Sequence, residues 1–220
     1  MTPEVRRAVV VTGGDPIDPA SAAGLGPGSY VIAADSGLDR AMELGLDVDL
    51  AVGDFDSVSP GSLAAAATAG CRIERHPPAK DRTDLELALL AAVDHGATHV
   101  LVLGGHGGRL DHLLANALVL AEERFAALSV EAVMGPARLA VVRRGLQLVG
   151  PHGELVSLLA VGGPARDVRT EGLRYPLRGE DLYPGSTRGV SNQMSEATAT
   201  LTVGSGVVLV IRPLRAELVG

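Results

Sequence analysis

The chain has 220 residues, 46% of them hydrophobic and 20% charged, which is the composition of a folded globular protein of one or two domains and excludes a disordered chain. With 19 basic and 26 acidic residues its formal net charge is −7, the opposite of a basic nucleic-acid-binding surface, so we expect no nucleic-acid partner. Apolar runs such as Val207–Ile211 fall far short of the roughly 20 residues of a membrane span. The single cysteine, Cys71, excludes internal disulfides. We therefore expect a cytoplasmic protein with no membrane partner.

Short β-branched runs alternate with amphipathic stretches in the first part of the chain. This alternation predicts βαβ units, hence an α/β sandwich domain around a mainly parallel sheet. The expected strands are Ala8–Val11, Tyr30–Ala34, Leu50–Val52, His99–Leu103 and Ser129–Val133, and the expected helices are Leu38–Leu44, Leu63–Ala69, Leu85–Val93 and Leu110–Phe125. Ser59 before Pro60 and Thr83 before Glu86 have the spacing of helix N-terminal caps.

Near residue 135 the pattern changes to short strand-like runs separated by glycine and proline. These runs are Leu139–Val142, Glu154–Leu159, Ala197–Val203 and Val207–Ile211. Without a helical pattern between them, they predict a smaller all-β domain, closed as a sandwich or barrel. We expect two domains, residues 1–135 and 136–220.

Acidic or glycine-rich segments follow four of the expected strands. They are Thr12–Asp15, Ala34–Gly37, Gly53–Ser57 and Gly104–His112. Ligands of open parallel sheets bind outside the carboxyl ends of the strands. Asp and Gly also form ordinary turns, which would explain one such loop, but four together favour a site.

Asp54-Phe55-Asp56 is the sharpest of these segments. In an extended stretch residues i and i+2 point the same way, so both carboxylates could share a hard cation such as Mg²⁺, although the same triplet also occurs as a solvated turn. Asp81 and Asp84 flank Thr83 at an expected helix start, where capping explains one of the two acids but not obviously both.

The glycine-rich segment ends at Arg109 and runs into an expected helix. Backbone N–H groups of Gly107 and Gly108, the helix N-terminus and the Arg109 guanidinium could together bind phosphate. The segment is not a Walker A motif, because no Lys-Ser/Thr follows the glycines.

These motifs, in this order, resemble those of the thiamine pyrophosphokinase family. The matching segments are Ala34–Gly37, Gly53–Ser57, Lys80–Asp84, Gly107–His112, Gly172–Leu177 and Ser191–Asn192. The chain departs from the family pattern at Ser36, where the family often has Gly, and at Tyr175, where it often has Trp.

The resemblance implies a homodimer that transfers the diphosphate of ATP to the thiamine hydroxyl and releases AMP. An α/β domain would bind Mg-ATP, and the β-sandwich would help form the thiamine site at the subunit interface. The implied catalytic residues are Asp35, Asp54, Asp56, Asp81, Asp84, Arg109 and Asp111, with Asp35 or Asp84 orienting the nucleophile and Asp54, Asp56, Asp81 and Asp111 around Mg²⁺. The nucleotide side would comprise Lys80, Thr83, Gly107, Gly108, Arg109 and His112, and the thiamine side Tyr175, Ser191 and Asn192.

Two other functions are open at this point. One is a related diphosphokinase for another hydroxymethyl acceptor, such as 6-hydroxymethyl-dihydropterin. The other is a non-catalytic regulator that binds nucleotide or thiamine. The motif set lacks none of its carboxylates, which argues against the regulator, since a decayed site usually loses charges that no metal requires.

Overall fold

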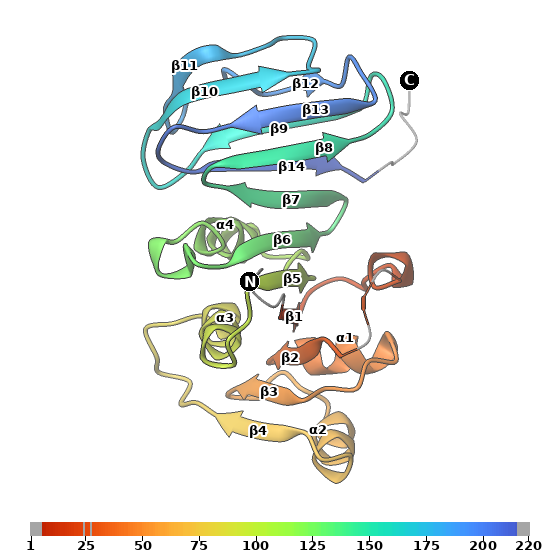
Figure 1. Ribbon diagram of the computed structural model, residues 1–220. Helices are drawn as coiled ribbons and strands as arrows, with labels where there is room; N and C mark the ends of the chain where they lie inside the picture. Colours follow the sequence, from red (N-terminus) through yellow and green to blue (C-terminus); the bar gives the residue numbers. More distant parts are fainter. Residues whose placement is uncertain (1–5, 24, 27, 215–220) are drawn as a thin grey trace. The chain divides into compact units, whose positions relative to one another are not determined.

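The computed structural model describes residues 6–23, 25–26 and 28–214, and its chain divides into two units (Figure 1). The first unit continues to Val119 and resumes over Ala127–Gly135, while the second holds Leu120–Ala126 and the chain from Pro136. The first unit is α/β and the second all-β, so both parts of the expected fold class are confirmed.

Parallel strands form the sheet of the first unit. They are β1 (Arg7–Thr12), β2 (Tyr30–Ala34), β3 (Leu50–Gly53), β4 (Arg72–Arg75), β5 (His99–Leu103) and β6 (Ser129–Met134), in the order β6-β5-β1-β2-β3-β4. The strand order reverses between β1 and β5. The loops that follow the carboxyl ends of these strands therefore flank the switch point where ligands bind in such sheets.

Helices connect these strands on both faces of the sheet. They are α1 (Gly37–Glu43), α2 (Pro60–Thr68), α3 (Asp84–Asp94) and α4 (Leu110–Val119), with a 3₁₀ turn at Pro19–Ser21. The helices α1 and α2 lie on one face and α3 on the other (Figure 1). At the start of α1, a Cβ on Gly37 would lie 2.1 Å from the carbonyl oxygen of Val11, so glycine lets this helix pack closely against β1.

Two elements of the first part differ from the prediction. The strand β4 was not expected, because its sequence, Arg-Ile-Glu-Arg, lies at the sheet edge and is mostly polar. The last helix ends at Val119 instead of Phe125, and a 3₁₀ turn follows at Glu123–Phe125. The Arg143 guanidinium donates hydrogen bonds of 2.8 Å to the carbonyls of Ala121 and Glu122, which stabilises the chain outside the helix.

The second unit is a sandwich of two antiparallel sheets. Its strands are β7 (Ala137–Val142), β8 (Gly145–Val149), β9 (Leu155–Ala160), β10 (Ala165–Glu171), β11 (Arg178–Leu182), β12 (Asn192–Gln193), β13 (Thr198–Thr202) and β14 (Val208–Pro213). One sheet has the order β12-β9-β14-β7 and the other β11-β10-β13-β8. Buried side chains of both, among them Leu158, Val210, Val168 and Leu201, form one core.

The strands β8, β10, β11 and β12 were missed in the sequence. Arg, Asp, Glu and Thr make up most of β10, and its buried positions alternate with exposed ones, so the apolar pattern is too sparse to mark it. Among the described residues, no helix has both the length and the apolar character that crossing a bilayer requires.

Candidate functional site

Three carboxylates meet where β2 and β3 end. Asp35 directly follows β2, and Asp54 and Asp56 follow β3. One carboxylate oxygen from each lies within 4.8 Å of the other two. The parallel arrangement of β2 and β3 brings their carboxyl ends to the same edge and so unites motifs that are about twenty residues apart in the sequence.

The loop after β3 is not extended at Phe55, so of the two interpretations of Asp54-Phe55-Asp56, an extended stretch and a turn, the structure excludes the extended one. Phe55 has a left-handed φ of 62°, and the Asp56 N–H donates to Asp54 Oδ1 at 3.3 Å. Asp35, itself at φ 47°, accepts a hydrogen bond of 3.0 Å from the Phe55 N–H. A Cβ on Gly53 would lie 3.1 Å from Asp35 Cα. Left-handed backbone at two non-glycine residues is strained, and such strain concentrates at functional sites.

Lys80 links the carboxylate cluster to the start of α3. Its ammonium group lies 3.1 Å from Asp54 Oδ2 and 2.9 Å from Asp84 Oδ1. The side chains of Lys80 and Asp54 are only 14% and 15% exposed, so solvent screens this ion pair less than a surface pair. Lys80 therefore fixes Asp54 and Asp84 relative to each other.

Burial disfavours the charged form of both Asp35 and Asp54, yet their pKa values shift in opposite directions. At Asp54 the hydrogen bonds from Lys80 and the Asp56 N–H, with the Lys80 charge, outweigh burial and lower the pKa. At Asp35 burial dominates, the negative charges of nearby aspartates add to it, and the pKa is raised. Asp35 therefore lies in the less favourable environment for a free carboxylate.

The donor set of this cluster fits a hard divalent cation. Carboxylate oxygens are the ligands that Mg²⁺ prefers, and Mg²⁺ commonly uses one or two carboxylates together with water and substrate phosphates. Asp35, Asp54 and Asp56 would hold such an ion, and its charge would offset the aspartate charges that add to burial in raising the pKa of Asp35.

The glycine-rich loop after β5 is joined to the loop after β1. The Asp15 N–H donates to the His106 carbonyl at 2.7 Å, and Asp15 Oδ2 lies 3.1 Å from His106 Nδ1. A Cβ on Gly14 would lie 2.1 Å from the same carbonyl oxygen, so the contact requires glycine. Neither His106 nor Asp15 was predicted as a site residue. Both lie in segments that follow expected strands, Asp15 in Thr12–Asp15 and His106 in Gly104–His112.

Arg109 and Asp111 pair with each other at the start of α4. Arg109 Nε donates to Asp111 Oδ1 at 3.2 Å, and the hydrogen bond and charge of Arg109 lower the pKa of Asp111 to about 2. Both side chains are exposed, as are Gly108 and His112. Within the described residues, Asp111 lies outside the carboxylate cluster of Asp35.

Thr83, Asp84 and Asp81, which are close in the sequence, have different environments at the start of α3. Thr83 is the N-cap of α3 and accepts a hydrogen bond of 3.2 Å from the Glu86 N–H. Asp84 begins the helix, where a negative charge is favourable, and contacts Lys80. Asp81 is exposed and, in the described part of the chain, is not in the carboxylate cluster.

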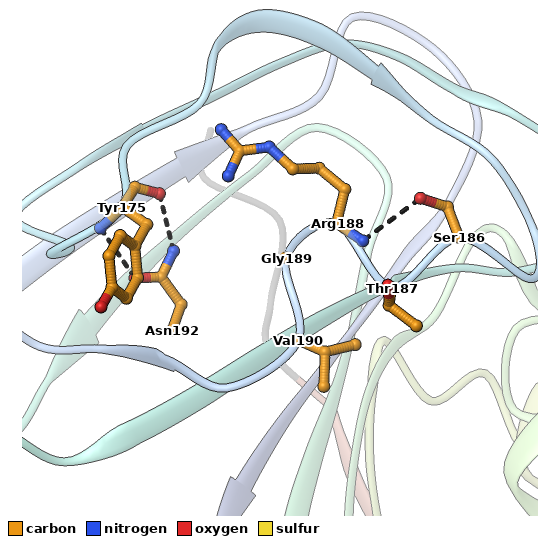
Figure 2. A pocket seen from close by; sticks show the side chains of 7 residues that line it. All are labelled: Tyr175, Ser186, Thr187, Arg188, Gly189, Val190 and Asn192. Atoms are coloured by element: carbon orange, nitrogen blue, oxygen red, sulfur yellow. Dashed lines mark hydrogen bonds between the residues drawn. The ribbon is translucent and has the colours of Figure 1, made fainter.

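The second unit carries a pocket of about 390 Å³ (Figure 2). Seven residues line it: Tyr175, Ser186, Thr187, Arg188, Gly189, Val190 and Asn192. Its walls come from the segment before β11, from the loop between β11 and β12, and from the first residue of β12. Two of the predicted thiamine-side residues, Tyr175 and Asn192, therefore meet at one pocket.

Ser191 and Asn192, adjacent in the chain, are placed differently. Ser191 is exposed, has a left-handed φ of 56°, and donates its N–H to Ser157 Oγ at 3.1 Å. It is not among the pocket-lining residues. Asn192 is 2% exposed, and its side chain bonds backbone groups of Tyr175 (Figure 2).

Sequence reasoning missed the loop residues of the pocket, chiefly Arg188. Its guanidinium donates to Glu180 Oε1 at 3.1 Å, and its N–H donates to Ser186 Oγ at 3.2 Å. The glycines at both ends of Gly185–Gly189 mark a loop, but nothing in the local pattern indicates a concave surface.

An α/β unit with clustered carboxylates at its strand ends is followed by a β-sandwich with its own pocket. Similarity to kinase relatives and to a kinase catalytic domain places the chain among the transferases. The model of the thiamin pyrophosphokinase catalytic domain matches residues 26–132, and that of the thiamin pyrophosphokinase vitamin B1 binding domain matches residues 143–208. The chain belongs to the thiamine pyrophosphokinase family.

Individual relatives agree with this assignment. The thiamine pyrophosphokinase of Bacillus subtilis is 25% identical over 190 residues, which are 82% of this chain and 86% of the relative. A crystal structure of a thiamin pyrophosphokinase family protein from Enterococcus faecalis has a TM-score of 0.78 and 27% identity, and the match covers 96% of this chain and 100% of that one. The crystal structure of the Bacillus subtilis protein has a TM-score of 0.83 at 22% identity, covers 96% of this chain and 100% of its own, and supports the fold.

Proposed function

We propose that this protein is a thiamine pyrophosphokinase, which transfers the diphosphate of ATP to the hydroxyl of thiamine and gives thiamine diphosphate and AMP. The observation that carries the proposal is the convergence of Asp35, Asp54 and Asp56 at the strand ends of the unit that matches the catalytic-domain model. The match of the second unit to a vitamin B1 binding domain supports thiamine over a pterin as acceptor.

On the donor side, the chain has to position a polyphosphate and neutralise its charge. Mg²⁺ bound at Asp35, Asp54 and Asp56 would supply positive charge to the transferring phosphates. Lys80 holds Asp54 in place, and Arg109, exposed at the start of α4, is available to a phosphate if it exchanges Asp111 for that partner. Because phosphoryl transfer depends chiefly on alignment and charge stabilisation, these groups suffice for the chemistry.

On the acceptor side, the pocket of the second unit would hold thiamine. Tyr175 supplies an exposed aromatic ring for a flat heterocycle, and Val190 adds apolar surface. Asp35 or Asp84 would orient the acceptor hydroxyl, as the family resemblance implies. The roles of Asp81, Asp111, Thr83, His112 and Ser191, the homodimer with its interfacial acceptor site, and the cytoplasmic location stay predictions from the sequence.

Acceptor profiling tests the proposal. The protein is incubated with ATP, Mg²⁺ and either thiamine or 6-hydroxymethyl-dihydropterin, and AMP is measured. We expect AMP with thiamine and none above background with the pterin. AMP with the pterin alone would identify the other diphosphokinase, and thiamine binding without AMP would identify a non-catalytic regulator.

A further inference from the structure

Tyr175 supplies the aromatic side chain that lines the pocket of the second unit, and its backbone is hydrogen-bonded by Asn192 of β12. Its side chain is 49% exposed, whereas Asn192 beside it is almost fully buried. Figure 2 shows the Asn192 amide facing the backbone of Tyr175. Asn192 Oδ1 accepts the Tyr175 N–H at 3.0 Å, and Asn192 Nδ2 donates to the Tyr175 carbonyl at 2.8 Å.

These bonds occupy most of what the Asn192 side chain can offer a ligand. A carboxamide accepts two hydrogen bonds and donates two. Its oxygen also accepts the Gln193 N–H at 2.9 Å, so both acceptor positions are filled by backbone groups. One N–H of the amide is committed to the Tyr175 carbonyl as well.

Gln193, the residue after Asn192, supports the same tyrosine indirectly, through Arg174, which lies against the tyrosine ring. Gln193 Oε1 accepts a hydrogen bond of 3.0 Å from Arg174, and the Arg174 guanidinium lies 5.5 Å from the centre of the Tyr175 ring. The Arg174 N–H also donates to the Gln193 carbonyl at 2.9 Å. Both residues of β12, which pairs with β9, therefore support Tyr175, one at its backbone and one at a ring face.

We propose that Asn192 is a positioning residue, which contributes to acceptor binding through Tyr175 instead of by contacting the acceptor. The inference rests on the proposed function for the identity of the acceptor, and it assigns Asn192 a role different from the hydrogen bond to thiamine that the sequence predicted. A Tyr175 whose backbone is held in place before binding loses less conformational freedom when the acceptor binds, which is how preorganisation increases affinity.

A double-mutant cycle separates the two roles. Asn192→Ala should raise the Michaelis constant for thiamine about two- to tenfold and leave that for ATP near its wild-type value. In a Tyr175→Ala background, the same change should have little further effect, since the group through which Asn192 acts is gone. If the effects of the two substitutions multiply, Asn192 contacts the acceptor directly and the proposal fails.

Two further variants control for general destabilisation. Asn192→Asp keeps the acceptor oxygen for the two N–H groups but places a buried carboxylate oxygen against the Tyr175 carbonyl, so its effect should be at least as large as that of Asn192→Ala. Leu148→Ala removes a buried side chain of β8, which lies at the opposite edge of its sheet from β11 and so away from the segment of Tyr175. It should lower the melting temperature and leave the thiamine Michaelis constant unchanged. An increase equal to that of Asn192→Ala would reduce the effect to lost stability and overturn the proposal.

A substrate-free measurement separates this proposal from the proposed function. The chain has no tryptophan, so Tyr175→Trp introduces a single tryptophan at the pocket wall, which can be excited apart from the two remaining tyrosines. Adding Asn192→Ala should speed the local component of its fluorescence anisotropy decay if Asn192 orients this residue. An unchanged decay contradicts the positioning role even in an active enzyme. A faster decay in a protein that makes no AMP would refute the enzyme assignment, while the positioning role of Asn192 toward Tyr175 would stand.

Discussion

Asp35 accepts a 3.0 Å hydrogen bond from the backbone N–H of Phe55, and this contact ties the end of β2 to the turn after β3. The bond holds Phe55 in a left-handed conformation between two aspartates and so sets the positions of their carboxylates. Burial raises the pKa of Asp35 and so disfavours its charged form, whereas binding of Mg²⁺ requires that charged form. Stability and function therefore conflict at this residue.

Replacement of Asp35 by Asn should stabilise the protein at neutral pH and impair its activity. The amide keeps the oxygen that binds the Phe55 N–H but removes a charge from a buried, negative environment. A carboxyl whose pKa is raised on folding destabilises the fold as pH rises through that pKa, and not below its ordinary value of 3.8, where it is protonated in both states. We expect a gain of roughly 0.5 to 2 kcal/mol at pH 7, measured by urea unfolding, that disappears in acid. Equal stability of both proteins at pH 7 would contradict the raised pKa.

Asp54→Asn and Asp56→Asn should each lower turnover while leaving the fold intact. A metal acting as a Lewis acid typically contributes several kcal/mol of transition-state stabilisation, so the expected loss is about a hundredfold or more. The same variants should lose part of the increase in melting temperature that Mg²⁺ gives the wild type. Asp47→Asn, an exposed aspartate ahead of β3, is the matched control and should change neither quantity. Wild-type turnover in both cluster variants would refute the metal site.

Lys80→Met should destabilise the protein by about 1.5 to 3 kcal/mol, the range for hydrogen bonds to charged groups. Lys80 lowers the pKa of Asp54, so its contribution is present above the ordinary carboxyl pKa of 3.8 and is lost as pH falls through the lowered value. The stability difference between variant and wild type should therefore be constant near neutrality and shrink in acid. Thermal unfolding from pH 2 to 8 measures it. A difference that persists unchanged at pH 2 would show that Lys80 stabilises by packing alone.

The pair of Arg188 and Glu180 gives a prediction about the acceptor's charge. Arg188 is the charged residue among the seven that line the pocket, while thiamine is itself a cation. Glu180, 3.1 Å away, offsets that charge. Glu180→Gln should raise the thiamine Michaelis constant about two- to fivefold, a modest effect of the kind expected for an exposed ion pair. Glu180→Gln combined with Arg188→Gln should restore it. If the double variant is no better than the single one, charge compensation is not the role of Glu180.

The sequence was most informative where candidate site residues directly follow a buried strand. Asp35 and Asp54 could be placed at one site because each follows a recognisable buried strand, and parallel strands bring their carboxyl ends together. The sequence could not reveal the left-handed φ of Phe55, because that conformation depends on a hydrogen bond that its N–H donates to Asp35, twenty positions away. The contact of Lys80 with both Asp54 and Asp84 likewise depends on tertiary structure.

The second unit was harder to predict for a related reason. Three of the missed strands, β8, β11 and β12, lie at sheet edges, and the fourth, β10, lies inside its sheet but is mostly polar, so the apolar pattern that would mark them is weak. Asn192 shows the limit most clearly. A Ser-Asn pair before a strand is compatible with a turn, a ligand contact or a brace, and only the positions of Tyr175 and Gln193 distinguish them.

If the carboxylate cluster supports diphosphate transfer from ATP to thiamine, the products must show it. The product stoichiometry is measured by chromatography or ³¹P NMR for wild type and Asp54→Asn in the presence of Mg²⁺. We expect one AMP for each thiamine diphosphate in the wild type, no ADP, and near loss of both products in the variant. Release of ADP with thiamine monophosphate, or equal AMP formation by both proteins, would contradict it.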